Sequence, residues 1–174
     1  MSYLEKWGVE KRQIMELDWW KETTLEDVRF VSLPARHFSG RGLFDRFKTQ
    51  WCSWLLIGKN NKIFFSGDTG YSDSFKKVGE KFGPIDLTFI KIAAYDKLWT
   101  DIHLNPEQAV SVHQDIRGKV LVPIHWSTFN LALHSWYEPI ERLVKAGKEA
   151  NIKYLTPRIG EEIEVDKHIN SSWW

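Results

Sequence analysis

The sequence has very little of the residue that builds covalent cross-links and thiolate metal sites. Its 174 residues include one cysteine, Cys52. A single cysteine excludes an internal disulfide, and a thiolate-rich zinc site is excluded with it. Cys52 lies in the apolar run 51–57, where we expect a buried, unreactive thiol.

Long hydrophobic runs and an excess of one charge are also absent. No run approaches the ~20 apolar residues of a membrane span, and Glu5 and Lys6 stand where a signal peptide would need an apolar core. The 24 Lys+Arg and 23 Asp+Glu give a net charge of +1, so no overall field recruits nucleic acid or an anionic membrane. We therefore expect a cytoplasmic protein with no transmembrane segment and no nucleic-acid partner.

The overall composition is that of an ordinary globular protein. Hydrophobic residues make up 43% and charged residues 27%, and the length suits one domain with a real core. Aromatic residues reach 14%, with ten tryptophans. We expect most of these rings in the core or lining grooves, with a few available as an apolar lip for a lipid-like ligand.

Apolar runs and helical stripes alternate along the chain, which predicts an α+β fold with a mixed sheet and helices packed on it. The helix start at Asn105, Pro106 and Glu107 combines a cap, a first-turn proline and a first-turn carboxylate. Residues 22–27 are polar and turn-like. The predicted strands cover 14–17, 28–33, 51–57, 62–66, 87–92, 120–124, 152–155 and 162–165, and the predicted helices cover 3–8, 72–82, 105–116 and 139–150.

One predicted strand stops abruptly at a carboxylate. Residues 63–71 read I-F-F-S-G-D-T-G-Y, with Asp68 between Gly67 and Gly70. Glycine allows backbone angles and close approaches that a Cβ blocks, and chemistry is commonly placed on loops at strand ends. The alternative is that Asp68 only hydrogen-bonds its own turn.

Two histidines occupy similar positions. His37 follows the strand that ends before Pro34, and His125 follows the strand 120–124. Loop histidines commonly face solvent without chemistry, so that alternative stays open. Two imidazoles and a carboxylate nevertheless form a ligand set for zinc, manganese or iron, and residues so far apart meet only if the fold brings them together. His113, inside a helix, is expected to pack or to face solvent.

Several ordered motifs occur along the chain: P-A-R-H at 34–37, F-S-G-D-T-G-Y at 65–71, F-G-P-I-D-L at 82–87, A-Y at 94–95, H-L-N-P-E-Q-A-V at 103–110 and P-I-H-W-S-T-F at 123–129. Together they resemble the metallo-β-lactamase superfamily, and within it the N-acylphosphatidylethanolamine-hydrolysing phospholipase D branch. The resemblance covers roughly residues 7–163.

The resemblance implies a four-layer αββα sandwich and a dinuclear metal hydrolase. It makes His37 a ligand of one metal, His125 a ligand of the other, and Asp68 the bridge between them. Zn²⁺ is the expected ion, with Mn²⁺ or Fe as alternatives. His103 matches a family histidine near the active site, where it would contact the substrate phosphate or protonate the leaving group. The alternative for His103 is simple loop or cap packing.

The sequence departs from the family in one respect. The H-x-H-x-D-H run that supplies most remaining ligands is absent, and no two of the six histidines, at 37, 103, 113, 125, 134 and 168, are close enough to form it. We therefore predict a partial domain, the C-terminal half of the sandwich, over 1–167. Residues 168–174 are predicted to be a frayed tail in which His168 has no role. Three ligands spread over two metal positions predict an incomplete site.

Three functions stay open at this point. The first is a phosphodiester hydrolase for a small-molecule or phospholipid-like substrate, inactive as an isolated chain and completed by an N-terminal half or a homodimer partner. The second is a lactone or ester hydrolase using the same site. The third is a non-catalytic module whose exposed sheet face binds a protein.

Overall fold

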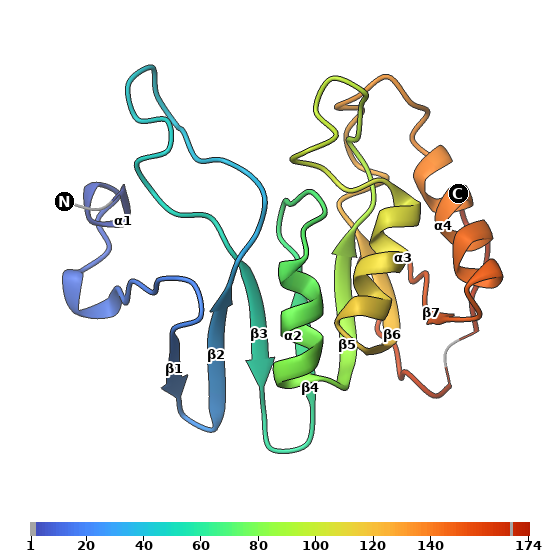
Figure 1. The fold of residues 1–174 in the computed structure, drawn as a ribbon, viewed down its shortest axis with the longest axis horizontal. Helices are drawn as coiled ribbons and strands as arrows, with labels where there is room; N and C mark the ends of the chain where they lie inside the picture. Colours follow the sequence, from blue (N-terminus) through green and yellow to red (C-terminus); the bar gives the residue numbers. More distant parts are fainter. Residues whose placement is uncertain (1–2, 168) are drawn as a thin grey trace.

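A computed structural model describes residues 3–167 and 169–174 and contains one seven-stranded mixed sheet with the strands in sequence order (Figure 1). The first four strands are antiparallel, and the pairs from β4 to β7 are parallel. The predicted α+β class is confirmed. The strands are β1 (Glu22–Leu25), β2 (Val28–Leu33), β3 (Ser53–Ile57), β4 (Lys62–Phe65), β5 (Ile85–Lys91), β6 (Gly118–Ile124) and β7 (Lys153–Tyr154), and the helices are α1 (Tyr3–Lys6), α2 (Ser74–Phe82), α3 (Pro106–Asp115) and α4 (Glu138–Glu149), with a 3-10 turn η1 (Lys11–Gln13).

Helices cover one face of the sheet, because each parallel connection crosses back over that face. Figure 1 shows α2 and α3 in front of the strands, with α4 beside α3. The helices bury Phe75, Val110 and Ile140 in one core with Phe64 and Leu121 of the sheet. No helix among the described residues has both the length and the apolar character needed to cross a bilayer.

The predicted start of α3 is confirmed in detail. The Asn105 side chain accepts a hydrogen bond from the Gln108 N–H at 2.8 Å, and the Gln108 side chain accepts one from the Asn105 N–H at 3.1 Å. This reciprocal pair satisfies two backbone donors that the first turn leaves open. It fixes the point at which the loop carrying His103 enters the helix.

The other face of the sheet is largely uncovered. Phe64 is fully buried under the helices, whereas the next residue, Phe65, is 43% exposed on the opposite face. Around Phe65 lies an apolar groove of about 520 Å³, lined by Phe30, Trp54, Leu56, Ile63, Phe65 and Phe89. Ile163 and Val165 pack against the β5–β6 part of this face. The described residues therefore contain one layer of strands and one layer of helices.

Three local predictions were wrong. Residues 14–17 and 162–165 form no strand, and the segment predicted as a turn contains β1. β1 is mostly exposed at the edge of the sheet, so its side chains are polar although its backbone pairs with β2. Residues 162–165 look like a strand because apolar residues alternate there. Ile163 and Val165 pack on Val120 and Val122, but the segment does not pair with the strands of the sheet.

The expectation of a frayed tail was wrong for residues 169–174. The Asn170 side chain accepts from the Thr156 N–H and donates to the Tyr154 carbonyl, each at 2.8 Å. The Trp173 indole N–H donates to the Thr156 carbonyl at 2.9 Å, and its ring lies 5.0 Å from that of Trp126. His168 lies outside the described residues, and a domain boundary at 167 stays a prediction.

Candidate metal centre

The segments that follow β2, β4, β5 and β6 leave the sheet at its upper edge in Figure 1, and they carry four candidate side chains. His37 follows β2, Asp68 follows β4, and His125 follows β6, while His103 lies between β5 and α3. β2 and β4 are both antiparallel to β3 and therefore run in the same direction, as does β6 through the parallel pairs. The carboxyl ends of these strands consequently meet at one edge.

The loops of His37 and Asp68 are joined by their backbones. The Gly70 N–H donates to the Arg36 carbonyl at 2.8 Å, and the Arg36 N–H donates to Thr69 Oγ1 at 2.9 Å. A Cβ on Gly70 would lie 1.9 Å from the Asp101 carbonyl oxygen, so only glycine fits there. This bridge keeps the two loops adjacent.

The distances between the four side chains define a compact cluster. The Nε2 atoms of His37 and His103 are 3.3 Å apart, and these two histidines and Asp68 each offer one ligand atom within 4.8 Å of the others. His125 Nε2 lies 3.2 Å from Asp68 Oδ1. The structure thus brings the predicted ligands His37, Asp68 and His125 together with His103, while their roles as ligands and catalyst stay predictions.

Several residues at this edge adopt left-handed backbone conformations, among them His125 and Ala94. The φ angle is 62° at His125 and 57° at Ala94. Such angles are uncommon outside glycine and are found at sites where the surrounding structure enforces them. Both backbone polar groups of Ala94 are hydrogen-bonded. Its carbonyl accepts from His103 Nδ1 at 2.5 Å and from the Trp99 indole N–H at 2.8 Å. Its N–H donates to His134 Nε2 at 3.0 Å.

Burial governs the protonation of the histidines. Burial and, to a smaller extent, the nearby Lys91 charge lower the pKa of His103 to about 4, and the hydrogen bond to Ala94 opposes this change. Burial likewise lowers the pKa of His125, and Asp68 acts in the opposite direction. Both rings are therefore neutral near pH 7 and offer nitrogen lone pairs.

Lys91 is a functional candidate that the sequence reasoning missed. Its side chain is fully buried, and its Nζ donates to the Ala93 carbonyl at 2.7 Å. Burial lowers the Lys91 pKa to about 7, against the attraction of Asp68. The available signal was a lysine near the end of the mostly apolar predicted strand 87–92, since a buried lysine is rare unless it is paired or functional.

His113 was expected either to pack or to face solvent, and the structure shows that it packs. The ring is 2% exposed, and its Nδ1 lies 2.7 Å from Thr88 Oγ1. It belongs to the interface between α3 and the sheet and takes no part in the cluster. His113 and His103 therefore differ in their surroundings, since His113 is packed inside the core and His103 lies in the cluster at the sheet edge.

The donor set fits a divalent cation. Neutral imidazole nitrogens and a carboxylate oxygen are ligands of zinc, manganese and iron, and the second ring nitrogens of His37 and His103 face backbone carbonyl oxygens, at 3.0 Å from Phe38 and 2.5 Å from Ala94. Such outer contacts orient histidine ligands in metal sites. The described residues place too few donors here to complete two ions.

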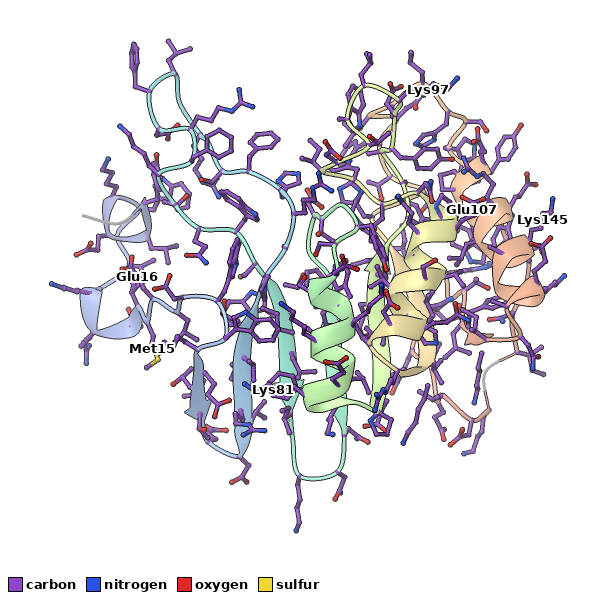
Figure 2. All side chains as sticks on the ribbon, in the orientation of Figure 1. Met15, Glu16, Lys81, Lys97, Glu107 and Lys145 are labelled. Atoms are coloured by element: carbon purple, nitrogen blue, oxygen red, sulfur yellow. The ribbon has the colours of Figure 1, made fainter. Side chains whose placement is uncertain are left out.

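Two cavities of different character flank the cluster. The cavity beside His125 measures about 490 Å³ and is mostly apolar, with Val122, Trp126, Phe129, Leu131, Ile159 and Trp173 in its lining and Arg158 as a charged member. The cavity beside His103 measures about 680 Å³ and is more polar, with Tyr95, Lys97, His134, Glu138 and Arg142 in its lining. Figure 2 shows Lys97 at the same upper edge and Glu107 on α3 below it.

The polar cavity has a fixed wall. Arg142 on α4 contacts Glu107 on α3 at 2.6 Å and Glu138 at 3.2 Å, and the Tyr95 hydroxyl donates to Glu138 at 2.8 Å. These contacts join α3 and α4 to the loop after β5. The wall beside His103 is therefore tied to two helices.

Comparison with known proteins gives the class of the chain. Residues 1–126 match the family model described as β-lactamase superfamily domain. The chain therefore belongs to the β-lactamase superfamily, as the resemblance in the sequence indicated. Its similarity to the N-acylphosphatidylethanolamine-hydrolysing branch is also confirmed: it is 38% identical over 138 residues to N-acyl-phosphatidylethanolamine-hydrolyzing phospholipase D 1 of Caenorhabditis elegans, covering 75% of this chain and 39% of that protein.

Two further proteins are similar to the chain. An uncharacterized protein of Mycobacterium tuberculosis is 42% identical over 177 residues, covering 99% of this chain and 47% of that protein. The structure of Igni18, a metallo hydrolase from Ignicoccus hospitalis, matches with a TM-score of 0.66 at 20% identity, over 84% of this chain and 58% of that one. The second match shows the shared fold. The chain spans about half the length, or less, of these two curated relatives.

Proposed function

We propose that this chain is part of a metal-dependent hydrolase of the phosphodiester, phospholipase D-like type, and that it is inactive in isolation. The observation that carries the proposal is the convergence of His37, Asp68 and His125 at one sheet edge, with His103 beside them. The name of the Caenorhabditis elegans relative supports the reaction type.

In the completed enzyme, His37 and His125 would each hold one ion and Asp68 would be shared between the two. Zn²⁺ is the ion we propose, with Mn²⁺ or Fe as alternatives. Such ions, when bound, lower the pKa of water and neutralise charge on phosphoryl oxygens. His103 presents its Nε2 to the same space as a neutral ring, so it accepts a hydrogen bond or proton there, and it serves as a leaving-group acid only after taking up a proton.

The two cavities support an amphiphilic, phospholipid-like substrate. The apolar cavity adjoins His125 and suits an acyl chain, whereas the polar cavity adjoins His103 and suits a charged group. A phosphodiester between two such parts would lie at the cluster. Arg158 in the apolar cavity lining adds a cation that a phosphate or carboxylate group would contact.

We propose that the uncovered sheet face binds the complementary N-terminal half of the domain. The groove around Phe65 is apolar, and the chain spans only 47% of its Mycobacterium tuberculosis relative. Packing a second sheet there would bury Trp54, Phe65 and their neighbours, which is the usual arrangement of two face-to-face sheets. A second copy of this chain is the alternative occupant.

Complementation tests the proposal. The N-terminal half of the Mycobacterium tuberculosis relative is co-expressed with this chain, and Zn²⁺ content and hydrolysis of bis-p-nitrophenyl phosphate are measured. We expect turnover only in the complex, at least about 100-fold weaker in Asp68→Asn and unchanged in the surface variant Lys145→Ala. Absence of both bound metal and activity in a well-formed complex would contradict the proposal.

A lactone or ester hydrolase remains the second enzyme candidate, because the same cluster would also serve carbonyl chemistry. Comparing a lactone with bis-p-nitrophenyl phosphate as substrates of the complex separates the two reactions. The uncovered face also supports the third candidate, a non-catalytic module. Sedimentation tests that candidate, since a stable monomer that binds neither the complement nor a second copy argues against it.

A further inference from the structure

His103 is held with its Nε2 lone pair directed at His37. Its Nδ1 lies 2.5 Å from the carbonyl oxygen of Ala94. A carbonyl only accepts, so Nδ1 carries the proton and donates, and Nε2 of the neutral ring is left without one. Ala94, which supplies that carbonyl, has a left-handed backbone.

His37 is held in the same way. Its Nδ1 lies 3.0 Å from the Phe38 carbonyl oxygen, which likewise makes Nδ1 the donor and Nε2 the free acceptor. The two Nε2 atoms are 3.3 Å apart, in rings that stack at 17°. Two lone pairs therefore face each other, with the Asp68 carboxylate as a third acceptor within 4.8 Å. Three acceptors this close repel one another unless a proton or a cation lies between them.

The spacing favours a metal ion over a proton. Two nitrogens bound at about 2.0–2.1 Å to one tetrahedral ion lie about 3.3 Å apart, which agrees with the 3.3 Å between the Nε2 atoms. We propose that in this chain on its own, His37, His103 and Asp68 bind a single divalent cation, with His125 outside the coordination sphere as the partner that orients Asp68. The Asp68 carboxylate, 43% exposed, has the freedom to close the remaining distance.

This arrangement differs from the shared dinuclear site proposed above, and it rests on the same cluster. With His103 as a ligand, its Nε2 is no longer available to a substrate. In the isolated chain His103 is thereby held on the metal, and completion of the domain would return His103 to the substrate side. Metal binding is measured without substrate, so an absence of turnover says nothing about the single-ion site. Conversely, if the isolated chain does not bind one ion, the proposed function of the complex is not affected.

Metal binding by the isolated chain tests the inference. Zn²⁺ affinity and stoichiometry are measured by calorimetry, and the site geometry by the visible spectrum of bound Co²⁺. We expect one ion per chain and a four-coordinate Co²⁺ spectrum. We expect His103→Gln to weaken Zn²⁺ binding by at least about 100-fold, and His125→Gln by only about tenfold, as for an outer-sphere partner.

Lys145→Gln is the control. It introduces the same new side chain at an exposed position of α4, away from the cluster. We expect its affinity to stay within about twofold of the parent, with circular dichroism confirming that each variant is folded.

Nitrogen NMR of the histidine rings identifies the ligands directly. We expect Zn²⁺ to shift the Nε2 resonances of His37 and His103, with Nδ1 still protonated, and to leave His125 without a bound ion. Wild-type affinity in His103→Gln, a metal shift at His125 in place of His103, or a proton shared between His37 and His103 with no Zn²⁺ binding would each overturn the proposal.

Discussion

His125 Nε2 lies 3.2 Å from Asp68 Oδ1, and this contact joins the ends of β6 and β4 at the candidate metal centre. The Asp68 charge raises the pKa of His125, opposing the effect of burial, and acts in the same direction on Lys91 and His103. One carboxylate therefore influences the protonation of three neighbours.

Asp68→Asn is expected to lower the pKa of His125 and of His103, because the charge that favours their protonated forms is removed. Proton NMR titration of the ring protons, with a chelator present, measures both values. Asp73→Asn, an exposed carboxylate paired with Lys76, is the control and should leave them unchanged. A rise in the pKa of His125 in the Asp68 variant would contradict the assigned electrostatics.

Lys91→Met is expected to change how stability depends on pH. The folded pKa of about 7 is below the ordinary value of 10.5, so between these values the unfolded chain binds more protons and the free energy of unfolding of the parent rises with pH. The variant lacks this rise, so it should be more stable than the parent near pH 7, by on the order of 4 kcal/mol, and the difference should shrink toward pH 10.

Urea unfolding of the metal-free proteins at several pH values measures this difference. Lys145→Met, at an exposed position of α4, should follow the parent curve. Parallel curves for the Lys91 variant and the parent would show that Lys91 does not lose its proton on folding.

Gly118→Ala is expected to destabilise the fold by about 2–4 kcal/mol. A Cβ at position 118 would lie 2.3 Å from His113 Nδ1 and 2.8 Å from Thr88 Cγ2, and the His113 ring is 2% exposed with little room to move. Gly58→Ala is the matched control, because its nearest neighbour would be 3.7 Å away. Chemical denaturation compares the two, and equal stabilities would mean that the core beside α3 is more adaptable than its packing indicates.

Phe64 and Phe65 offer a paired test of the two sheet faces. Phe64→Ala should cost about 3–5 kcal/mol, because it removes a fully buried ring from the core. Phe65→Lys should leave the stability of the isolated chain within about 1 kcal/mol, since the ring is 43% exposed. The same Phe65 variant should weaken binding of the N-terminal half, which analytical ultracentrifugation of mixtures measures. Undiminished assembly would exclude this face as the docking surface.

Much of the fold was accessible from local patterns. β2 was predicted with its observed limits, and the Asn105 cap and Pro106 fixed the start of α3, because both signals depend on a few adjacent residues. β1 was missed because an exposed edge strand carries polar side chains. A strand was wrongly predicted at 162–165, because the apolar alternation of Ile163 and Val165 arises from packing on Val120 and Val122.

The candidate site was accessible only in part. His37, Asp68 and His125 were recognisable as residues at strand ends within family motifs, whereas Lys91 was overlooked because its burial beside Asp68 depends on neighbouring strands. The tail was predicted to be frayed because it stands at the end of the chain. In the structure Asn170 hydrogen-bonds to Tyr154 at the end of β7, and Trp173 hydrogen-bonds to Thr156 just after it.

The sequence by itself determined the alternation of strands and helices, the family, and the residue types available to hold a metal, because these depend on local composition and ordered motifs. Only the tertiary structure decided that His103 faces His37 at 3.3 Å and that His113, ten positions further along, is buried against Thr88. The physical reason is that a hydrogen bond or a shared cation depends on positions in space, and those are set by strand direction, by the Arg36–Gly70 bridge and by the left-handed turn at Ala94.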